Sequence, residues 1–197
     1  ELMTGGVDWI YMVPPDQFEN LAKVPGITTV SGEDMRIAFL QMDAAKRCGA
    51  TPFANLEVRR AVNHAIDRAA IAKNLVGGAS RVIDTACFPT QFGCDQNVMK
   101  YDYNPAKARE LLAKAGYPQG FETDIYGYRD RTYLEAIVGY LREVGIKANL
   151  KFMQYSALRD KSYADQTPFF KMTWGSYGMN DMSAITGHYF KFEKVDF

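Results

Sequence analysis

Apolar positions recur along this chain at two different spacings, and the change of spacing marks the predicted elements. From 55 to 75 the apolar residues return every three or four positions, which predicts one long helix with a narrow apolar stripe. Asn55 is placed to cap its first free amides, and Gly77 is placed to end it. The stripe consists of Val58, Ala61, Val62, Ala65, Ile66, Ala69, Ala72 and Leu75.

The second half of the chain changes repeatedly between the strand period and the helix period. A capped helix is expected to begin at Asn104-Pro105 and to end before Gly116. Because strands and helices alternate, the pattern predicts an α/β fold with a mainly parallel sheet flanked by helices and right-handed crossovers. The later elements are strands at 121–127, 146–152 and 169–174, and helices at 131–144 and 156–163.

The N-terminal quarter shows a weaker pattern. A short helix is predicted at 14–22, where Pro14, Pro15 and Asp16 open it. Strands are predicted at 27–30 and 35–42, and the second is an almost continuous apolar run of the kind that is buried on both faces. Residues 43–51 are polar and irregular.

Two runs of residues carry a family resemblance. Residues 52–68 read PFANLEVRRAVNHAIDR, and residues 103–118 read YNPAKARELLAKAGYP. In this order they resemble the signatures of the family 5 extracellular solute-binding proteins, the peptide- and nickel-binding class of ABC importers. The first run differs from the family pattern at Asn55, which replaces the usual acid but can still cap the helix. An unrelated α/β protein with two amphipathic helices is the simpler alternative.

The resemblance implies a periplasmic-binding-protein-like lobe. Residues 1–43 then correspond to the end of the first-lobe segment and the crossover strands, and residues 44–197 correspond to the second lobe. The chain would be a piece of a longer, two-lobed periplasmic or otherwise extracytoplasmic protein. Such a protein captures a small solute between its lobes and delivers it to an ABC permease in the membrane, without a cofactor. The resemblance leaves open whether the solute is a peptide, an opine, a sugar or a metal chelate.

Composition agrees with a globular domain. The chain has 197 residues, of which 47% are hydrophobic and 23% charged. Lys plus Arg and Asp plus Glu number 23 each, so the charge balance offers no footprint for nucleic acid or for an anionic membrane. Neither a bilayer-spanning run nor a secretory leader is recognisable, and we expect the chain to be mature or part of a longer one.

The segment 77–100 has no period and is too long for an idle connection. It contains Cys87 and Cys94, which are separated by six residues and can close a small disulfide loop in an exported protein. Two buried free thiols are the alternative. Cys48 is left over as a free thiol.

Ligands of parallel sheets bind beyond the carboxyl ends of the strands, so two strand ends are candidate sites. After 121–127 come Arg129 and Arg131, either of which could hold a carboxylate with its planar guanidinium group. By resemblance, dipeptide binders use an arginine in this neighbourhood. Arg129 is the expected ligand residue, whereas Arg131 could instead pair with Glu135 at helical spacing.

The second candidate end begins at Trp174, whose broad face suits ligand atoms. Residues 173–181 resemble the family's cleft-lining segment, which makes Trp174, Tyr177, Asn180 and Asp181 candidate ligand residues. Departures from the family pattern count against binding of free dipeptides, because no proline follows Asp181 and no acid stands near Ser176. The alternation of Phe170, Met172 and Trp174 also fits a core role for the tryptophan.

Metal binding and catalysis are the remaining classes. His188 lies near the position of a histidine in nickel-binding relatives, but one histidine is a poor metal site, and His64 falls within the long helix. No catalytic motif is present, and the candidates for acid–base work are the two histidines and a carboxylate pair such as Asp124 and Asp130. Two exposed acids that flank a loop are the commoner interpretation of such a pair. We therefore expect a binding protein, not an enzyme. The alternatives are a nickel- or metal-chelate-binding member of the family and, less favoured, a small α/β enzyme.

Overall fold

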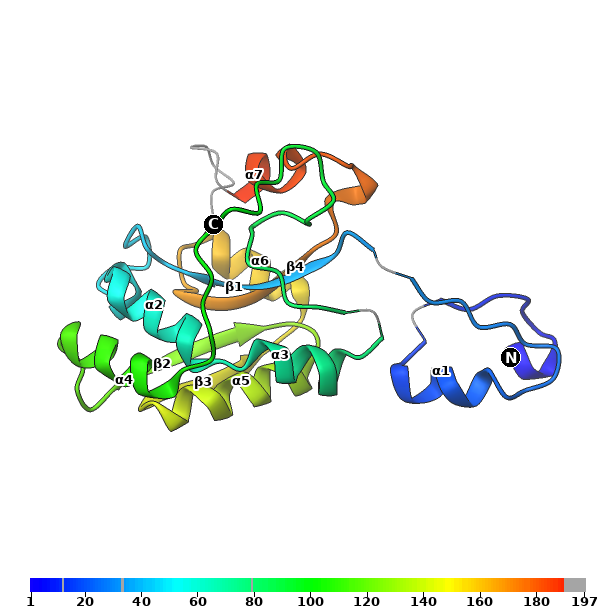
Figure 1. Ribbon diagram of the computed structural model, residues 1–197, viewed down its shortest axis with the longest axis horizontal. Helices are drawn as coiled ribbons and strands as arrows, with labels where there is room; N and C mark the ends of the chain where they lie inside the picture. The colour runs from blue at the N-terminus through cyan, green and yellow to red at the C-terminus, as the bar shows by residue number, and fades with distance from the viewer. Residues whose placement is uncertain (12, 33, 79, 190–197) are drawn as a thin grey trace.

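The computed structural model describes residues 1–11, 13–32, 34–78 and 80–189, which form one four-stranded sheet with helices on both faces. The strands lie in the order β1-β4-β2-β3 (Figure 1). They are β1 (Ile37–Met42), β2 (Phe121–Gly127), β3 (Ile146–Phe152) and β4 (Phe169–Trp174). The helices are α1 (Pro15–Leu21), α2 (Leu56–Ala65), α3 (Arg68–Ile71), α4 (Pro105–Lys114), α5 (Arg131–Glu143), α6 (Tyr155–Tyr163) and α7 (Ser183–Tyr189).

The sheet is mainly parallel, as the sequence predicts. β2 runs parallel to both β3 and β4, and the three strands occupy the predicted residues. β1 is antiparallel to β4, with Ile37 opposite Trp174 and Met42 opposite Phe169. The prediction of a strand buried on both faces at 35–42 is wrong for the described chain, because β1 is an edge strand and only Ile37 is buried in it. Residues 27–30 form no strand.

The two faces of the sheet carry separate apolar clusters. One face is covered by α2, α4 and α5 and contains Phe53, Ile125 and Phe169. The other is covered by α6, α7 and the segment around Cys87, and it contains Phe170 and Met172. In Figure 1, α4 and α5 lie below the sheet and α7 lies above it. Alternate side chains of β4 therefore point into different clusters.

The long helix predicted over 55–75 is interrupted, and this prediction is wrong. Asn55 caps α2 as expected, because its side chain accepts a hydrogen bond of 2.9 Å from the amide of Glu57. Ile66 then takes extended backbone angles (φ −107°, ψ 121°), and the Asp67 side chain caps α3 by accepting from Ala70 at 2.8 Å. A turn with π-helical hydrogen bonding (Ala72–Val76) ends at Gly77. The predicted stripe is nonetheless buried from Val58 to Ile66.

The helix α4 and the β2–α5–β3 unit that follows it are held by local interactions that the sequence indicates. Asn104 caps α4 through the amide of Lys107 (2.9 Å). Gly127 ends β2, and because it has no side chain, the fully buried Leu134 packs directly over it. This packing draws the first turn of α5 against the end of the strand.

Residues 1–11 and 13–32 form a separate segment. Figure 1 shows this segment, which contains α1, at one side of the molecule. None of its described side chains is buried, and Trp9 and Tyr11 stack on each other with 75% and 67% of their surfaces exposed. The division of the chain at residue 43 stays a prediction, since β1 joins the sheet of the main body.

Within the described ranges, no helix combines the length and apolar character that crossing a bilayer requires.

The cysteines behave as expected. Cys87 and Cys94 form a disulfide with a Cα to Cα distance of 5.8 Å, which confirms the predicted bridge. Cys48 is a free thiol beside Asp43, whose carboxylate accepts a hydrogen bond of 2.8 Å from the Cys48 amide. Burial, with a contribution from the negative charge of Asp43, raises the pKa of Cys48 to about 11, so the thiol stays protonated and unreactive near neutral pH.

Candidate functional site

Four segments meet at the edge of the sheet where the parallel strands end. β2, β3 and β4 finish here at Gly127, Phe152 and Trp174. β1 begins here, because it is antiparallel and Ile37 lies opposite Trp174. The residues before β1 therefore lie at the same edge as the loops after β2 and β4, which is the position where ligands bind in parallel α/β sheets.

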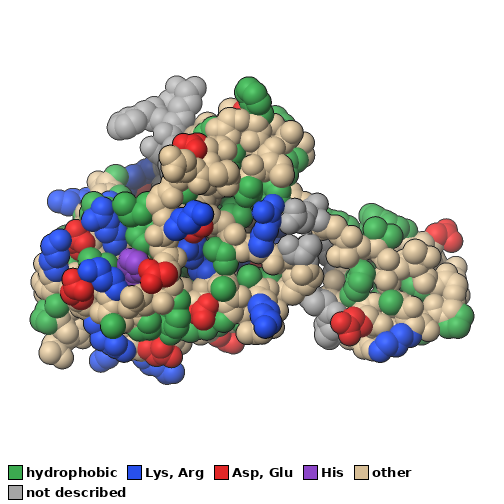
Figure 2. Space-filling model, viewed as in Figure 1, with side chains coloured by type: hydrophobic (Ala, Val, Ile, Leu, Met, Phe, Trp, Pro, Cys, Tyr) green, Lys and Arg blue, Asp and Glu red, His purple; other side chains and the backbone are tan. Residues whose placement is uncertain are grey.

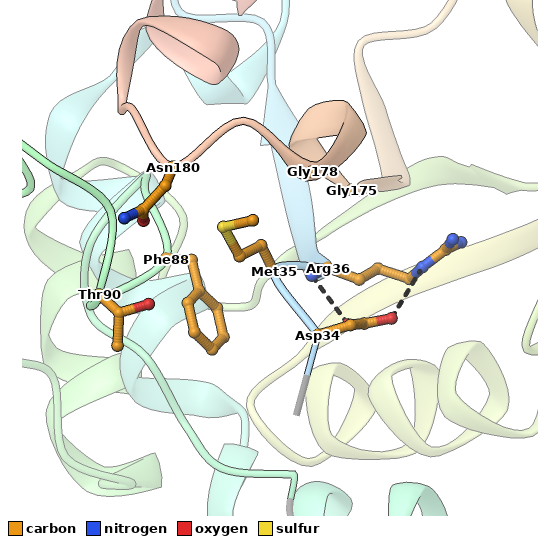
Figure 3. A pocket seen from close by; sticks show the side chains of 8 residues that line it. All are labelled: Asp34, Met35, Arg36, Phe88, Thr90, Gly175, Gly178 and Asn180. Atoms are coloured by element: carbon orange, nitrogen blue, oxygen red, sulfur yellow. Dashed lines mark hydrogen bonds and ion pairs between the residues drawn. The ribbon is translucent and has the colours of Figure 1, made fainter. Parts of the chain in front are cut away.

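A concavity of about 480 Å³ opens at this edge (Figure 3). In Figure 3, the side chains of Phe88, Met35 and Asn180 surround its centre, and Asp34 and Arg36 lie along one side. Three separate parts of the chain contribute to it, namely the start of β1, the disulfide loop and the turn after β4. Its lining consists of Asp34, Met35, Arg36, Phe88, Thr90, Gly175, Gly178 and Asn180.

Of these lining residues, the sequence predicted only Asn180. Asp34 and Arg36 were missed because their position depends on β1 being antiparallel. The backbone amide of Arg36 donates a hydrogen bond of 2.9 Å to the Asp34 carboxylate. The guanidinium group of Arg36 lies 3.8 Å from the same carboxylate and packs beside Gly175. Phe88 and Thr90 were missed because they lie in a segment without a period.

A buried ion pair lies on the α5 side of the same edge. The Lys171 side chain is 3% exposed, and its Nζ contacts the Asp130 carboxylate and donates to Thr173 at 3.3 Å. Burial lowers the pKa of Lys171 and outweighs the hydrogen bond and charge of Asp130, which raise it. Asp130 has a left-handed backbone (φ 56°). Burial of Tyr133 raises the pKa of that tyrosine, and the negative charge of Asp130 raises it further.

Arg129 joins this pair, whereas Arg131 does not. The Nε of Arg129 lies 3.3 Å from the Asp130 carboxylate, and 28% of its side chain is exposed. Arg131 pairs with Glu135 at 2.7 Å, as the alternative interpretation expected, and is 62% exposed. Arg129 lies outside the lining of the concavity, whereas Arg36 is part of that lining. After burial, the positive charges of Arg129 and Arg36 both help to lower the pKa of Lys171.

Trp174 is partly buried. It packs against the cluster that contains Phe170 and Met172, and its ring meets Tyr189 edge-on, with centroids 5.2 Å apart and planes at 89°. The indole Nε1 is buried. This placement combines a core contact with a position at the end of β4, so its predicted contact with ligand stays a prediction.

The turn after β4 holds the remaining predicted residues. Asn180 is exposed at the rim of the concavity. Asp181 lies two residues before the first residue of α7, and its carboxylate accepts a hydrogen bond of 2.8 Å from the Ser183 amide. The hydrogen bond with the Ser183 side chain, followed by this amide bond, lowers the pKa of Asp181. Tyr177 lies in a short 3-10 turn (Ser176–Gly178), and its side chain is outside the described part of the structure.

The disulfide loop is fastened to this turn. Gln91 is 3% exposed, and its side-chain oxygen accepts from the Phe88 amide at 2.9 Å. Its Nε2 donates to the carbonyls of Met179 (2.9 Å) and Asp181 (3.3 Å). The backbone of Phe92 adds two hydrogen bonds, to Asn180 (3.1 Å) and from Met182 (3.0 Å). The loop and the turn thus form one connected wall.

The residues considered for metal binding and catalysis lie apart. His64 is bound on α2 by Asp102, through its backbone carbonyl (2.9 Å) and its carboxylate (3.1 Å). The side chain of His188 is outside the described residues, although its backbone lies in α7. Asp124 contacts Tyr126 and Lys151, whereas Asp130 contacts Lys171 on the other face of the sheet. Within the described ranges, no three His, Cys, Asp or Glu side chains gather closely enough to hold a metal ion.

Comparison with known sequences gives a family match over almost the whole chain. Residues 1–195 match the family described as "Bacterial extracellular solute-binding proteins, family 5 Middle". The glutathione-binding protein GsiB of Salmonella choleraesuis (strain SC-B67) is 31% identical over 156 residues, which are 77% of this chain and 30% of that protein. Heme-binding protein A of Haemophilus influenzae is 26% identical over 170 residues, which are 82% of this chain and 30% of that protein.

Solved structures show the same fold. The periplasmic binding protein DppA of Helicobacter pylori, in complex with the peptide STSA, superposes with a TM-score of 0.76 at 26% identity, over 87% of this chain and 33% of that one. MoaA of A. tumefacien R10, in complex with mannopinic acid, gives a TM-score of 0.75 at 22% identity, over 89% and 35%. The chain therefore spans about a third of the length of these relatives.

Proposed function

The chain belongs to the bacterial extracellular solute-binding proteins of family 5, and we propose that it supplies one wall of the solute site in the substrate-binding component of an ABC importer. Relatives include proteins named for glutathione and heme, and structures in complex with the peptide STSA and with mannopinic acid. The proposed protein acts outside the cytoplasm and passes its solute to a membrane permease. It binds without chemical turnover.

The observation that carries this proposal is the concavity at the carboxyl edge of the sheet. It is lined from three parts of the chain and it is open to solvent, so that a second lobe could close over it. We place residues 1–43 with the crossover to that lobe. The exposure of residues 1–11 and 13–32 supports this placement for that part of the segment, because its apolar side chains need a further surface to bury them.

The charges at this edge favour a solute that carries a carboxylate. Two partly exposed cationic side chains, Arg36 and Arg129, lie at the edge together with the carboxylates Asp34 and Asp130, and the buried Lys171 adds a third positive charge behind them. The face of the molecule in Figure 2 carries side chains of both signs of charge. Arg129 is the proposed carboxylate ligand, and Trp174, Tyr177, Asn180 and Asp181 complete the proposed wall. A metal chelate remains the alternative solute, and no cluster of ligating side chains in the described ranges favours it.

Replacing Arg129 by glutamine in the complete protein is expected to weaken binding of a carboxylate solute by about 10- to 100-fold, because a charge-assisted hydrogen bond contributes about 1.5–3 kcal/mol. Isothermal titration calorimetry with glutathione, the dipeptide Met-Leu and the peptide STSA measures this change. Arg142→Gln is the matched control, because Arg142 lies in the last turn of α5, at the opposite edge of the sheet. Equal affinities in the two variants would remove Arg129 from the site, and failure of all three probes to bind the wild type would count against the proposed function.

A further inference from the structure

The disulfide loop, residues 87–94, is held in place by more interactions than a surface connection requires. Cys87 is 4% exposed and Gln91 is 3% exposed, although the loop belongs to no helix or strand. The disulfide between Cys87 and Cys94 closes the loop. The side-chain oxygen of Gln91 accepts a hydrogen bond from the Phe88 amide, and its Nε2 donates to the carbonyl of Met179 in the turn after β4. Because the buried side-chain amide of Gln91 hydrogen-bonds to both the disulfide loop and the turn after β4, the backbone of Phe88 and Thr90 is held in place.

The two side chains between these fixed points are the ones that reach the concavity. Phe88 and Thr90 line the concavity together with Met35 and Asn180. Figure 3 shows Phe88 and Thr90 on the side opposite Arg36. The guanidinium carbon of Arg81 lies 5.7 Å from the centroid of the Phe88 ring, and this contact further restricts the ring. Phe92, in the same loop, is 77% exposed and does not line the concavity.

From this arrangement we propose that the loop closed by Cys87 and Cys94 is a specificity-determining wall of the solute site, in which Phe88 packs against an apolar group of the solute and Thr90 hydrogen-bonds to a neighbouring polar group. The inference rests on the proposed function and adds the chemistry of the solute to it. An aromatic ring next to Met35 suits an aliphatic or thioether side chain. The Thr90 hydroxyl and the Asn180 amide suit a peptide-like amide. The solute class is therefore a small carboxylate with an apolar side chain beside an amide, such as a short peptide.

The test compares Phe88→Ala with Phe92→Ala in the complete protein, using the dipeptides Met-Leu and Gly-Gly and the tripeptide glutathione as calorimetric probes. We expect Phe88→Ala to weaken binding of Met-Leu at least about tenfold and to change that of Gly-Gly much less, because only the first has apolar side chains to lose contact with the ring. Phe92→Ala is expected to leave all affinities unchanged. Phe88→Leu, which keeps apolar bulk, is expected to retain most of the affinity for Met-Leu.

Each other outcome is decisive. If Phe88→Ala binds the probes as the wild type does, or if Phe88→Ala and Phe92→Ala lose affinity equally, the inference fails while the proposed function stands. If no probe binds the wild type, the proposed function and the inference fail together. Thermal unfolding of each variant separates a lost contact from a lost fold, and a Phe88→Ala protein that melts like the wild type but loses Met-Leu supports the inference.

Discussion

Replacing Asp130 by asparagine is expected to lower the free energy of unfolding by about 3 kcal/mol at pH 7, because it leaves the buried ammonium group of Lys171 without its counter-ion. Asparagine tolerates the left-handed backbone of this position, so the loss reports on charge and not on strain. Chemical denaturation measures it. The estimate lies at the lower end of the range for buried pairs, since Asp130 is 23% exposed.

The control is the reverse deletion. Lys171→Met removes the buried cation and leaves Asp130 beside Arg129, so it should cost much less, and the double variant should recover stability relative to Asp130→Asn. The pH dependence has a defined sign. The pKa of Lys171 is lowered on folding, so the unfolded chain binds more protons below the ordinary value of 10.5, and the stability of Asp130→Asn should rise with pH toward that value. Equal losses in the two single variants would contradict the description of this pair.

Replacing Gly120 by alanine is expected to have the largest effect on the fold, at about 4 kcal/mol or more. A Cβ at Gly120 would lie 1.9 Å from the carbonyl oxygen of Gly145 and 2.4 Å from its carbonyl carbon, and these backbone atoms cannot move aside without shifting β3. The backbone of Gly120 also has a φ of 76°. The two glycines stand immediately before β2 and β3, so their close approach lies where the two paired parallel strands begin.

Gly139→Ala is the matched control. Gly139 lies within α5, and a Cβ there would meet no atom within 4 Å. This substitution should stabilise the protein by about 0.5–1 kcal/mol, because alanine favours the helix. Thermal or chemical unfolding of the two variants should therefore show shifts of opposite sign. A Gly120→Ala protein as stable as the wild type would mean that the two turns do not touch.

Local patterns predicted the elements that local forces determine. The residues of β2, β3 and β4 were correct because β3 alternates apolar and polar residues without interruption and because the connecting helices have recognisable first and last residues. The break at Ile66 was missed because the apolar stripe continues across it at helical spacing. Asp67 carried the only local signal, since an acid within a helix can also cap a new one.

The composition of the site depends on contacts between distant segments, which periodicity does not encode. Asn180 could be predicted because it follows a strand end. Arg36 reaches the site only because β1 is antiparallel, and Phe88 reaches it only because Gln91 and the disulfide dock an irregular loop on the turn after β4. The available sequence signal that this loop is fixed was the pair of cysteines that can close it, with Gln91 between them.

Hydrogen–deuterium exchange of the complete protein, with and without the calorimetric probe that binds most tightly, tests the central proposal most directly. If the carboxyl edge of the sheet is a wall of the solute site, bound solute should slow exchange in peptides that cover 34–37, 87–92, 127–131 and 174–181, while peptides at the opposite edge, around Gly120 and Gly145, stay unchanged. Protection that spares these four segments, or that appears only at the opposite edge, would contradict the proposed site.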